Sequence, residues 1–212
     1  PRDMEGDLAK LEAEGVDLVF APDASEMYPD GFETTIDVGG IAQRLEGERR
    51  PGHFQGVATV VCKLLTIVRP DNVYFGQKDA QQCLVIRRLN ADLDLGAEVV
   101  VMPTVRDPDG LALSSRNAYL SAEDREAALS LYRSLRLAES RYKDRVRDAN
   151  TIRREMLDIL EAEPSASMEY VSVADAETLV ELDVVDRPAL VSMAVRIGRV
   201  RLIDNVVLGR SE

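Results

Sequence analysis

Short apolar runs that alternate with helical patterns constrain the fold of this chain more than any other feature. Runs at residues 17–22, 73–75 and 99–103 each end at, or just before, a glycine or a proline, as short buried strands commonly do. Residues 53–68 repeat their apolar side chains at steps of three and four, and Asp79 can cap a helix that continues to about Leu93. This alternation predicts an α/β protein with a doubly wound parallel sheet.

The loop at residues 106–110, Arg-Asp-Pro-Asp-Gly, marks a change in the pattern, and we place a domain boundary there. The first domain is expected to span residues 1–105, with a further helix at 4–14 and a short strand at 34–38. Residues 106–212 are expected to form a small α+β domain with two helices capped by Ser121 and Asn150. Its three strands are predicted at residues 170–173, 190–197 and 200–208, the last two joined by a turn at Gly198 and Arg199.

Composition narrows the class of protein further. With 45% apolar and 30% charged residues, the chain has enough apolar material for a core. Cys62 and Cys83 both lie in apolar helical patterns, which favours reduced thiols and a cytoplasmic location. No apolar run reaches the roughly 20 residues that span a bilayer, and no leader pattern opens the sequence, so neither a membrane nor a secretory role is expected.

Charge is distributed unevenly along the chain. The net charge of −12 argues against a nucleic-acid partner, which would require a broad basic surface. Residues 1–37 hold eleven acidic and two basic residues, whereas residues 44–88 hold eight basic and four acidic residues. The basic window is consistent either with ordinary solvated helix faces or with a local site for an anion.

Residues 76–79, Gly-Gln-Lys-Asp, lie where a predicted strand gives way to a predicted helix. Open α/β sheets bind ligands at such positions, and free N–H groups at a helix start favour anions. Lys78 would add a positive charge for phosphate, and Asp79 could cap the helix or accept hydrogen bonds from ribose. The alternative is a capped turn that carries a surface lysine.

Residues 113–117, Leu-Ser-Ser-Arg-Asn, offer two adjacent hydroxyl groups and an arginine after a glycine-containing loop. These donors can surround a polyphosphate and stabilise its charge, although Ser and Asn are also common turn formers. Because the two motifs fall on the two sides of the proposed boundary, together they predict a cleft that holds phosphate between domains.

His53 is the single histidine in the sequence and follows Arg49 and Arg50 at the start of a predicted helix. The arginines and the helix N-terminus both disfavour its protonated form. It is therefore expected either to donate to phosphate as a neutral group or to fix the helix entry. No His, Cys and acidic residues have zinc-site spacing, so the metal expected is Mg²⁺ that arrives with the phosphates of ATP.

Four blocks, residues 26–29, 45–54, 76–82 and 109–120, carry a resemblance to a known family. In order and spacing they resemble the pantothenate synthetase (pantoate–β-alanine ligase) family, and residues 121–212 look like its small C-terminal domain. The resemblance implies a Rossmann-like sheet of the nucleotidyltransferase type and a homodimer. It also implies ATP-dependent condensation of pantoate with β-alanine to pantothenate through pantoyl adenylate, with release of pyrophosphate and AMP.

The resemblance also implies three groups of site residues. The catalytic group binds the phosphates and comprises Lys78, Ser114, Ser115 and Arg116. The group that holds ribose and adenine, partly through backbone atoms, adds Gly76, Gln77, Asp79, Val105 and Leu113. The pantoate group comprises Gln82, Val60 and Val61. Gln77 stands where the family usually has glutamate, a change that is tolerable where the backbone binds.

One family motif, His-x-Gly-His, does not occur in these 212 residues. The sequence therefore resembles the part of a pantothenate synthetase that follows this motif, and we expect residues 1–212 by themselves to bind ATP weakly and to turn over negligibly. Two alternatives remain open. The chain could be a non-catalytic homologue that retains ATP binding and dimerisation, or an adenylyl-transferring ligase with a different carboxylate acceptor.

Overall fold

The computed structural model describes residues 3–209 and divides into two compact units, Pro1–Thr35 and Ile36–Glu212. The first unit contains helices α1 (Met4–Ala13) and α2 (Ala24–Met27), and Gly15 follows α1 with a φ of 77°. The predicted helix at 4–14 is confirmed. The predicted strand at 17–22 is wrong: these residues form no strand, and Leu18 is 83% exposed. A strand requires a hydrogen-bonded neighbour, and residues 3–35 as described supply none.

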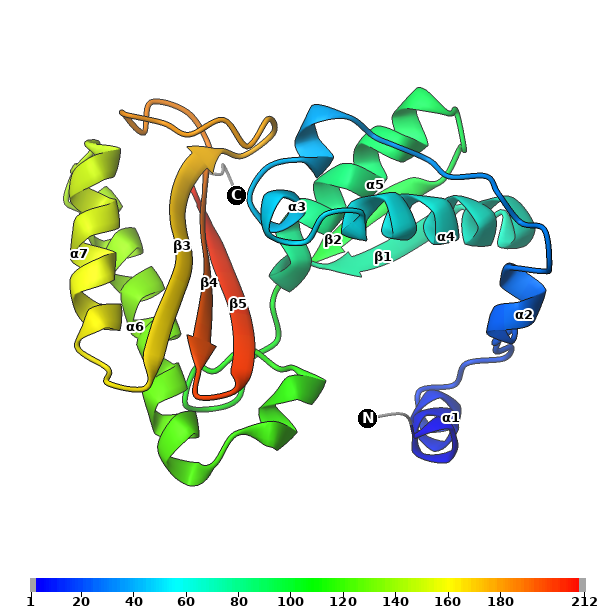
Figure 1. The fold of residues 1–212 in the computed structure, drawn as a ribbon, viewed down its shortest axis with the longest axis horizontal. Helices are drawn as coiled ribbons and strands as arrows, with labels where there is room; N and C mark the ends of the chain where they lie inside the picture. Colours follow the sequence, from blue (N-terminus) through cyan, green and yellow to red (C-terminus); the bar gives the residue numbers. More distant parts are fainter. Residues whose placement is uncertain (1–2, 210–212) are drawn as a thin grey trace. The chain divides into compact units, whose positions relative to one another are not determined.

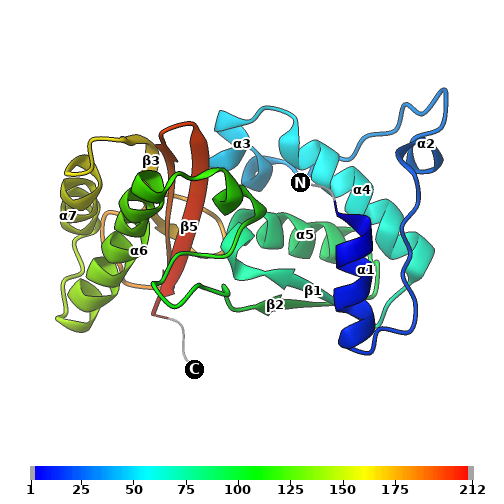
Figure 2. The same cartoon turned by 90° about the horizontal axis from the view of Figure 1, so that it is seen from below.

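The second unit begins with a parallel β-sheet and its helices (Figure 1). Strands β1 (Asn72–Gly76) and β2 (Glu98–Met102) pair in parallel, joined through helix α5 (Ala80–Asp92). Figure 2 shows α5 beside these strands, next to helix α4 (His53–Val68). Both helices are confirmed: α4 where the apolar periodicity predicts it, and α5 after the predicted cap at Asp79. The remaining short helices of this region are η1 (Gly40–Ala42), α3 (Glu46–Arg49) and η2 (Gln77–Asp79).

The predicted strand at 34–38 is also wrong, since these residues have no regular secondary structure. The backbone N–H of Ile36 instead donates to the hydroxyl of Thr59 on α4, at 3.0 Å. Ile36 and Val38 pack against the core that α4 and α5 share. Helices α4 and α5 therefore partly bury these apolar side chains. The alternating pattern of residues 34–38 does not by itself supply the partner strand that a β-strand would require.

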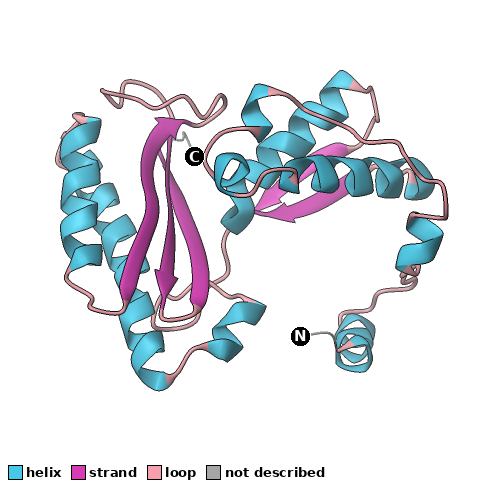
Figure 3. Cartoon of the chain, viewed as in Figure 1, coloured by secondary structure: helices cyan, strands magenta, loops and turns pink. Residues whose placement is uncertain are grey.

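The C-terminal half contains a three-stranded antiparallel sheet in the order β3-β4-β5, drawn in magenta in Figure 3. Its strands are β3 (Ala166–Asp175), β4 (Ala189–Ile197) and β5 (Val200–Leu208). Ile197 pairs with Val200, so Gly198 and Arg199 form the predicted two-residue turn. Helices α6 (Ala122–Lys143) and α7 (Ala149–Glu161) pack on this sheet. A short helix, η3 (Ser115–Tyr119), precedes α6.

Helix caps agree with the sequence at one helix and differ at the other. Ser121 accepts a hydrogen bond from the backbone N–H of Asp124 at the start of α6. Helix α7 is capped by Asp148 rather than by Asn150, because Asp148 accepts from the N–H of Thr151 at 2.6 Å. The side chain of Asn150 accepts from Arg153 instead. An ionised carboxylate is a good acceptor at a helix N-terminus, where the dipole adds to the hydrogen bond.

The fold class is confirmed, since a parallel sheet with helices is followed by a small antiparallel-sheet region. The largest buried cluster draws only on residues between Leu111 and Leu208, and a second lies between Phe54 and Leu89. A third, small cluster joins Ala80 to Leu179 and Leu190. The domain boundary after Val105 stays a prediction. No helix within residues 3–209 is both long and apolar enough to cross a membrane.

Replacing Gly110 with alanine is expected to lower the free energy of unfolding by about 2 kcal/mol. Gly110 has a φ of 98°, and a Cβ there would overlap the ring of Tyr132 on α6. Urea unfolding measures the effect. Gly56→Ala is the matched control, because Gly56 lies inside α4 with no atom near the added methyl group, and alanine should stabilise this helix by up to about 1 kcal/mol. Equal stability of the two variants would contradict the expectation.

Candidate active site

The turn that carries Lys78 is held by a single side chain on β5. Asn205 donates from its Nδ2 to the carbonyl oxygens of Gln77 and Lys78, at 3.0 and 2.9 Å. The Nε2 of Gln77 donates back to Asn205 Oδ1 at 3.0 Å. Asn205 is buried, so these bonds form away from competing water. The position of Lys78 is therefore fixed through its backbone by the C-terminal sheet.

Asp79 occupies the N-cap position of α5, but its side chain makes no capping hydrogen bond. Asp79 is thus at the predicted N-cap position, but its side chain does not make the hydrogen bond that a cap would make. A carboxylate that is not used by the helix remains able to accept hydrogen bonds from a ligand. Gly76, at the end of β1, has extended backbone angles, and its carbonyl oxygen accepts from the thiol of Cys83.

The loop that leads to Ser114 is fastened to β5 by an ion pair. Arg106 donates to both carboxylate oxygens of Asp204, at 2.6 and 2.9 Å, an arrangement that fixes direction as well as distance. Within the loop, the N–H of Leu113 donates to the carbonyl oxygen of Val105 at 2.9 Å. Asp204 and Asn205 are neighbours on β5, so one strand holds both predicted phosphate-binding segments.

Lys78, Ser114 and Arg116 line one cavity, which we call the Lys78–Arg116 cavity. The hydroxyl of Ser114 also accepts a hydrogen bond from the N–H of Arg116, which fixes the start of η3. Lys78 lines a second cavity, the His53 cavity, together with Asp79 and Gln82. The structure thus brings together five of the predicted site residues, with Lys78 at the junction of the two cavities.

Seven other predicted site residues lie outside these two cavities. Val105 and Leu113 are 65% and 48% exposed. Ser115 is exposed at the start of η3. Val60 and Val61 pack into the core shared by α4 and α5, and the side chain of Gln77 is engaged by Asn205. Gly76 lines neither cavity. The ligand roles of these residues stay predictions.

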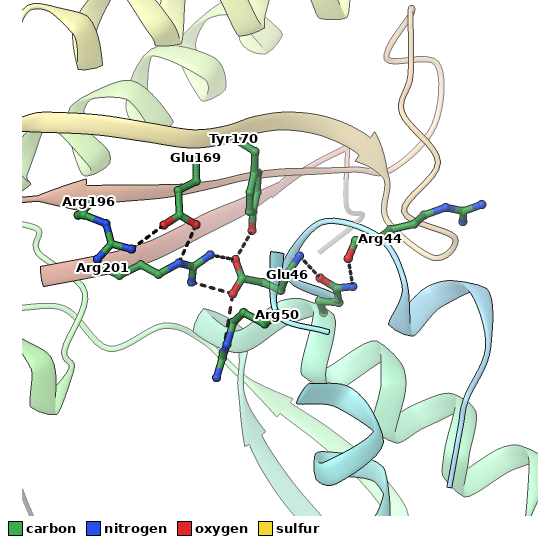
Figure 4. A network of polar contacts seen from close by, with 8 residues as sticks. Arg44, Glu46, Arg50, Glu169, Tyr170, Arg196 and Arg201 are labelled. Atoms are coloured by element: carbon green, nitrogen blue, oxygen red, sulfur yellow. Dashed lines mark hydrogen bonds and ion pairs between the residues drawn. The ribbon is translucent and has the colours of Figure 1, made fainter. Parts of the chain in front are cut away.

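Glu46 is the centre of a polar network beside the His53 cavity (Figure 4). Arg201 on β5 donates to both of its carboxylate oxygens, at 2.8 and 2.7 Å, and Tyr170 on β3 donates to Oε1 at 3.0 Å. The backbone N–H of Glu46 donates to Gln81 on α5 at 3.0 Å. Glu46 is only 6% exposed, so one buried residue joins α3 to the C-terminal sheet through its carboxylate and to α5 through its backbone N–H.

The protonation states of Glu46, Arg201 and Tyr170 follow from their burial and their hydrogen bonds to one another. Burial alone would raise the pKa of Glu46, but the hydrogen bonds and the charge of Arg201 outweigh burial and hold that pKa below its ordinary value. The pKa of Tyr170 is raised, first by burial and then by the adjacent Glu46 carboxylate. Hydrogen bonds to Glu46 raise the pKa of Arg201. Glu46 and Arg201 therefore form an ion pair, and Tyr170 donates to it as a neutral phenol.

The family described as Pantoate-beta-alanine ligase matches residues 1–207. This chain belongs to that family. A pantothenate synthetase of Roseiflexus sp. (strain RS-1) is 61% identical over 208 residues, which cover 98% of this chain and 75% of that protein. A pantothenate synthetase of Chloroflexus aurantiacus is 58% identical over 209 residues, covering 98% of this chain and 74% of that protein.

Solved structures of the ligase family have the same fold. A pantothenate synthetase from Thermus thermophilus aligns with a TM-score of 0.94 at 46% identity, covering 97% of this chain and 75% of that chain. A pantoate–β-alanine ligase from Francisella tularensis, complexed with β,γ-ATP and β-alanine, aligns with a TM-score of 0.76 at 33% identity. That alignment covers all of this chain and 72% of the other. The family resemblance is therefore confirmed.

Sequence reasoning missed four residues that hold the candidate site together: Glu46, Arg201, Asp204 and Asn205. Glu46 was visible in the block Leu45-Glu46-Gly47, but its partner lies far away in sequence on β5. The neighbouring Gly47 leaves no room for a Cβ because the carbonyl oxygen of Ala42 occupies that space. The adjacent polar residues at 204 and 205, inside the apolar run of residues 202–208, were the available signal, since buried polar groups require partners.

His53 lies at the start of α4 in the cavity that bears its name. Its pKa is lowered, first by burial and then by the charge of Arg50, so the predicted direction is confirmed and burial is the larger cause. Within residues 3–209, no group of three or more His, Cys, Asp or Glu side chains could hold a metal ion. Burial raises the pKa of the Cys83 thiol to about 11, which favours the protonated thiol over the nucleophilic thiolate at neutral pH.

Comparing the chain with its His53→Gln variant should reveal the pH dependence that His53 contributes. Because the pKa is lower in the folded state, the unfolded state takes up more protons, and the stabilising contribution of neutral His53 decreases as pH falls below about 6.5. Urea unfolding between pH 7.5 and 5.5 should therefore show the wild type losing stability relative to the variant. A constant difference across this range would contradict the lowered pKa.

Proposed function

We propose that the reaction of this ligase family, ATP-dependent condensation of pantoate with β-alanine, takes place at the Lys78–Arg116 and His53 cavities. One observation carries the proposal: Lys78 lies far in sequence from the segment that holds Ser114 and Arg116, yet all three residues line the same cavity. Two cations and a hydroxyl around one space suit the phosphates of ATP. Membership of the family supports the overall reaction, and the residues that line the two cavities support this location for it.

In the first step, a carboxylate oxygen of pantoate forms a bond to the α-phosphorus of ATP. The bond between that phosphorus and the oxygen leading to the β-phosphate breaks, and pyrophosphate leaves with the electron pair. Negative charge grows on the leaving group, so Lys78 and Arg116 stabilise the transition state more than the bound ATP. Ser114 and Ser115 donate hydrogen bonds to the phosphate oxygens. These four residues are the proposed catalytic group.

In the second step, the amine of β-alanine attacks the carbonyl carbon of pantoyl adenylate. The carbon–nitrogen bond forms, the amine loses a proton, and AMP leaves with the electrons of the broken carbon–oxygen bond. The protein's contribution here is mainly placement of the two reactants. Gln82, which lines the His53 cavity beside Asp79, is proposed to hydrogen-bond pantoate, and Val60 and Val61 are proposed to shape the apolar side of its pocket.

The remaining nucleotide contacts are proposed from the exposed loop and from the β1 turn. Asp79 is proposed to accept from ribose, a role supported by its unused carboxylate, with the backbone of Gly76 and Gln77 beside it. Val105 and Leu113 are proposed to lie against adenine. Their exposed side chains belong to residues joined by a backbone hydrogen bond, which gives the base a preformed apolar surface.

Magnesium, assembly and location are further parts of the proposal. The acidic side chains that line the two cavities with Lys78 are Glu46, Asp79 and Asp204. Arg201 engages Glu46 and Arg106 engages Asp204. This donor set fits Mg²⁺ that is held mainly by the phosphates of ATP. When bound, the ion would neutralise part of the phosphate charge. A homodimer and a cytoplasmic location stay predictions, and sedimentation analysis tests the first.

The function is tested with protein expressed from the complete reading frame that encodes residues 1–212. We expect pyrophosphate release that depends on pantoate and precedes β-alanine addition, followed by AMP and pantothenate once β-alanine is present. A polypeptide of residues 1–212 alone serves as the comparison and should turn over negligibly. Adenylation of other carboxylates but not of pantoate would contradict the proposed substrate. Absence of any adenylation would contradict the enzymatic role.

A further inference from the structure

A depression lined by five arginines lies next to the Lys78–Arg116 cavity, and we call it the arginine depression. Its cations are Arg50, Arg116, Arg196, Arg199 and Arg201, and Tyr119 lines it as well. They come from separate parts of the chain: Arg50 follows α3, Arg116 lies in η3, and the other three belong to the hairpin of β4 and β5. Arg116 lines both the cavity and the depression.

Among residues 3–209, two of these arginines form close ion pairs with carboxylates. Arg201 is paired with Glu46 and Glu169, and Arg196 donates to Glu169 at 3.2 Å. Figure 4 shows these pairs and, below Glu46, the side chain of Arg50. Arg50 reaches Glu46 only at 3.9 Å, whereas the oxygens of Glu46 already accept from Arg201 and Tyr170.

Arg116 and Arg199 have no ion-pair partner among residues 3–209, and both are exposed. The five guanidinium groups that line the depression thus have two carboxylates as ion-pair partners among residues 3–209, Glu46 and Glu169, in a chain whose net charge is −12. Like charges that converge on one depression repel each other unless an anion is bound there. The charge pattern is opposite to that of the rest of the molecule, which favours a site for a multivalent anion.

We propose that the arginine depression binds a polyphosphate anion, through Arg199 and Arg50 together with the shared Arg116. The inference rests on the proposed function, because Arg116 also contacts phosphate there. A di- or triphosphate suits the site because it carries several negative charges and because each guanidinium can donate two parallel hydrogen bonds to phosphate oxygens. Two sources supply this chemistry, namely the outer phosphates of ATP and the pyrophosphate formed on adenylation.

Arg199 is the residue that tests the proposal. It lies in the two-residue turn between β4 and β5, is exposed, and makes no hydrogen bond or ion pair among the described residues. Its removal should leave the fold intact, whereas Arg201 and Arg116 also support other contacts. Arg154→Gln is the matched control, because Arg154 is exposed on α7 and does not line the depression.

The experiment is calorimetric titration of the protein from the complete reading frame with inorganic pyrophosphate, ATP and AMP. We expect Arg199→Gln to weaken pyrophosphate binding by about fivefold to tenfold at low ionic strength. Affinity for AMP should stay unchanged, and Arg154→Gln should behave as the wild type. An equal fall in ATP affinity identifies the outer phosphates of the nucleotide as ligand, and a fall for pyrophosphate alone identifies the leaving group.

Two outcomes overturn the inference. One is unchanged pyrophosphate and ATP affinity in Arg199→Gln, and the other is an equal loss in Arg154→Gln, which would indicate a general effect of charge. Both are separable from failure of the proposed function. Pantoate-dependent adenylation with no effect of Arg199 rejects the inference alone. Pyrophosphate binding that depends on Arg199, without adenylation, rejects the function and retains the polyphosphate site.

Discussion

Lys78→Ala is expected to slow pantoyl adenylate formation about 100-fold. Lys78 lies at the junction of both cavities, and its charge is most valuable when pyrophosphate departs. Single-turnover release of pyrophosphate, measured with protein from the complete reading frame, reports this step. The second step should be far less affected: when pantoyl adenylate is supplied directly, its conversion with β-alanine should remain within a few-fold of the wild-type rate, because no polyphosphate leaves.

The control for Lys78 is Lys143→Ala, which removes an exposed lysine at the end of α6. It should leave both steps unchanged. Lys78→Arg should recover part of the adenylation rate, since it restores the charge with different geometry. If Lys78→Ala forms adenylate at the wild-type rate, Lys78 has no part in the mechanism. If both steps fall equally, the lysine acts in placement or folding rather than on the leaving group.

Glu46→Gln is expected to lower the free energy of unfolding by about 3 kcal/mol at neutral pH. The variant keeps the shape of the side chain but leaves Arg201, whose side chain is 15% exposed, with Glu169 as its one carboxylate partner among residues 3–209. It also weakens the link between α3 and the C-terminal sheet that Figure 4 shows.

Urea unfolding measures the decrease in the free energy of unfolding. Glu48→Gln on the exposed side of the same helix is the matched control and should change stability by less than about 0.5 kcal/mol.

The effect of Glu46→Gln should depend on pH in a defined direction. The folded-state pKa of Glu46 is lowered from 4.5, so its stabilising contribution is complete above that value and is lost as pH falls through the folded-state pKa. The difference between wild type and variant should therefore shrink below about pH 4.5. A difference that stays constant down to pH 3 would show that the carboxylate charge is not what stabilises the network.

Much of the secondary structure could be predicted because its causes are local. The apolar repeat at 53–68 defines α4 to the residue, and the turn at Gly198 and Arg199 follows from the residues beside it. The strands predicted at 17–22 and 34–38 failed because a strand depends on a neighbour that local sequence does not specify. The cap of α7 moved from Asn150 to Asp148, which is the kind of short shift that competing acceptors produce.

The candidate site also has a part that could be predicted from local sequence and a part that could not. The sequence by itself determined the chemical types: a lysine after a strand, two serines and an arginine after a glycine loop, and the family to which their order belongs. Only the tertiary structure decided that Lys78, Ser114 and Arg116 line one cavity. Asp204 and Asn205 on β5 bring the two segments together, and Glu46 with Arg201 joins α3 to the same strand. These contacts join residues distant in sequence, and their energy depends on burial and direction, which exist only once the chain has folded.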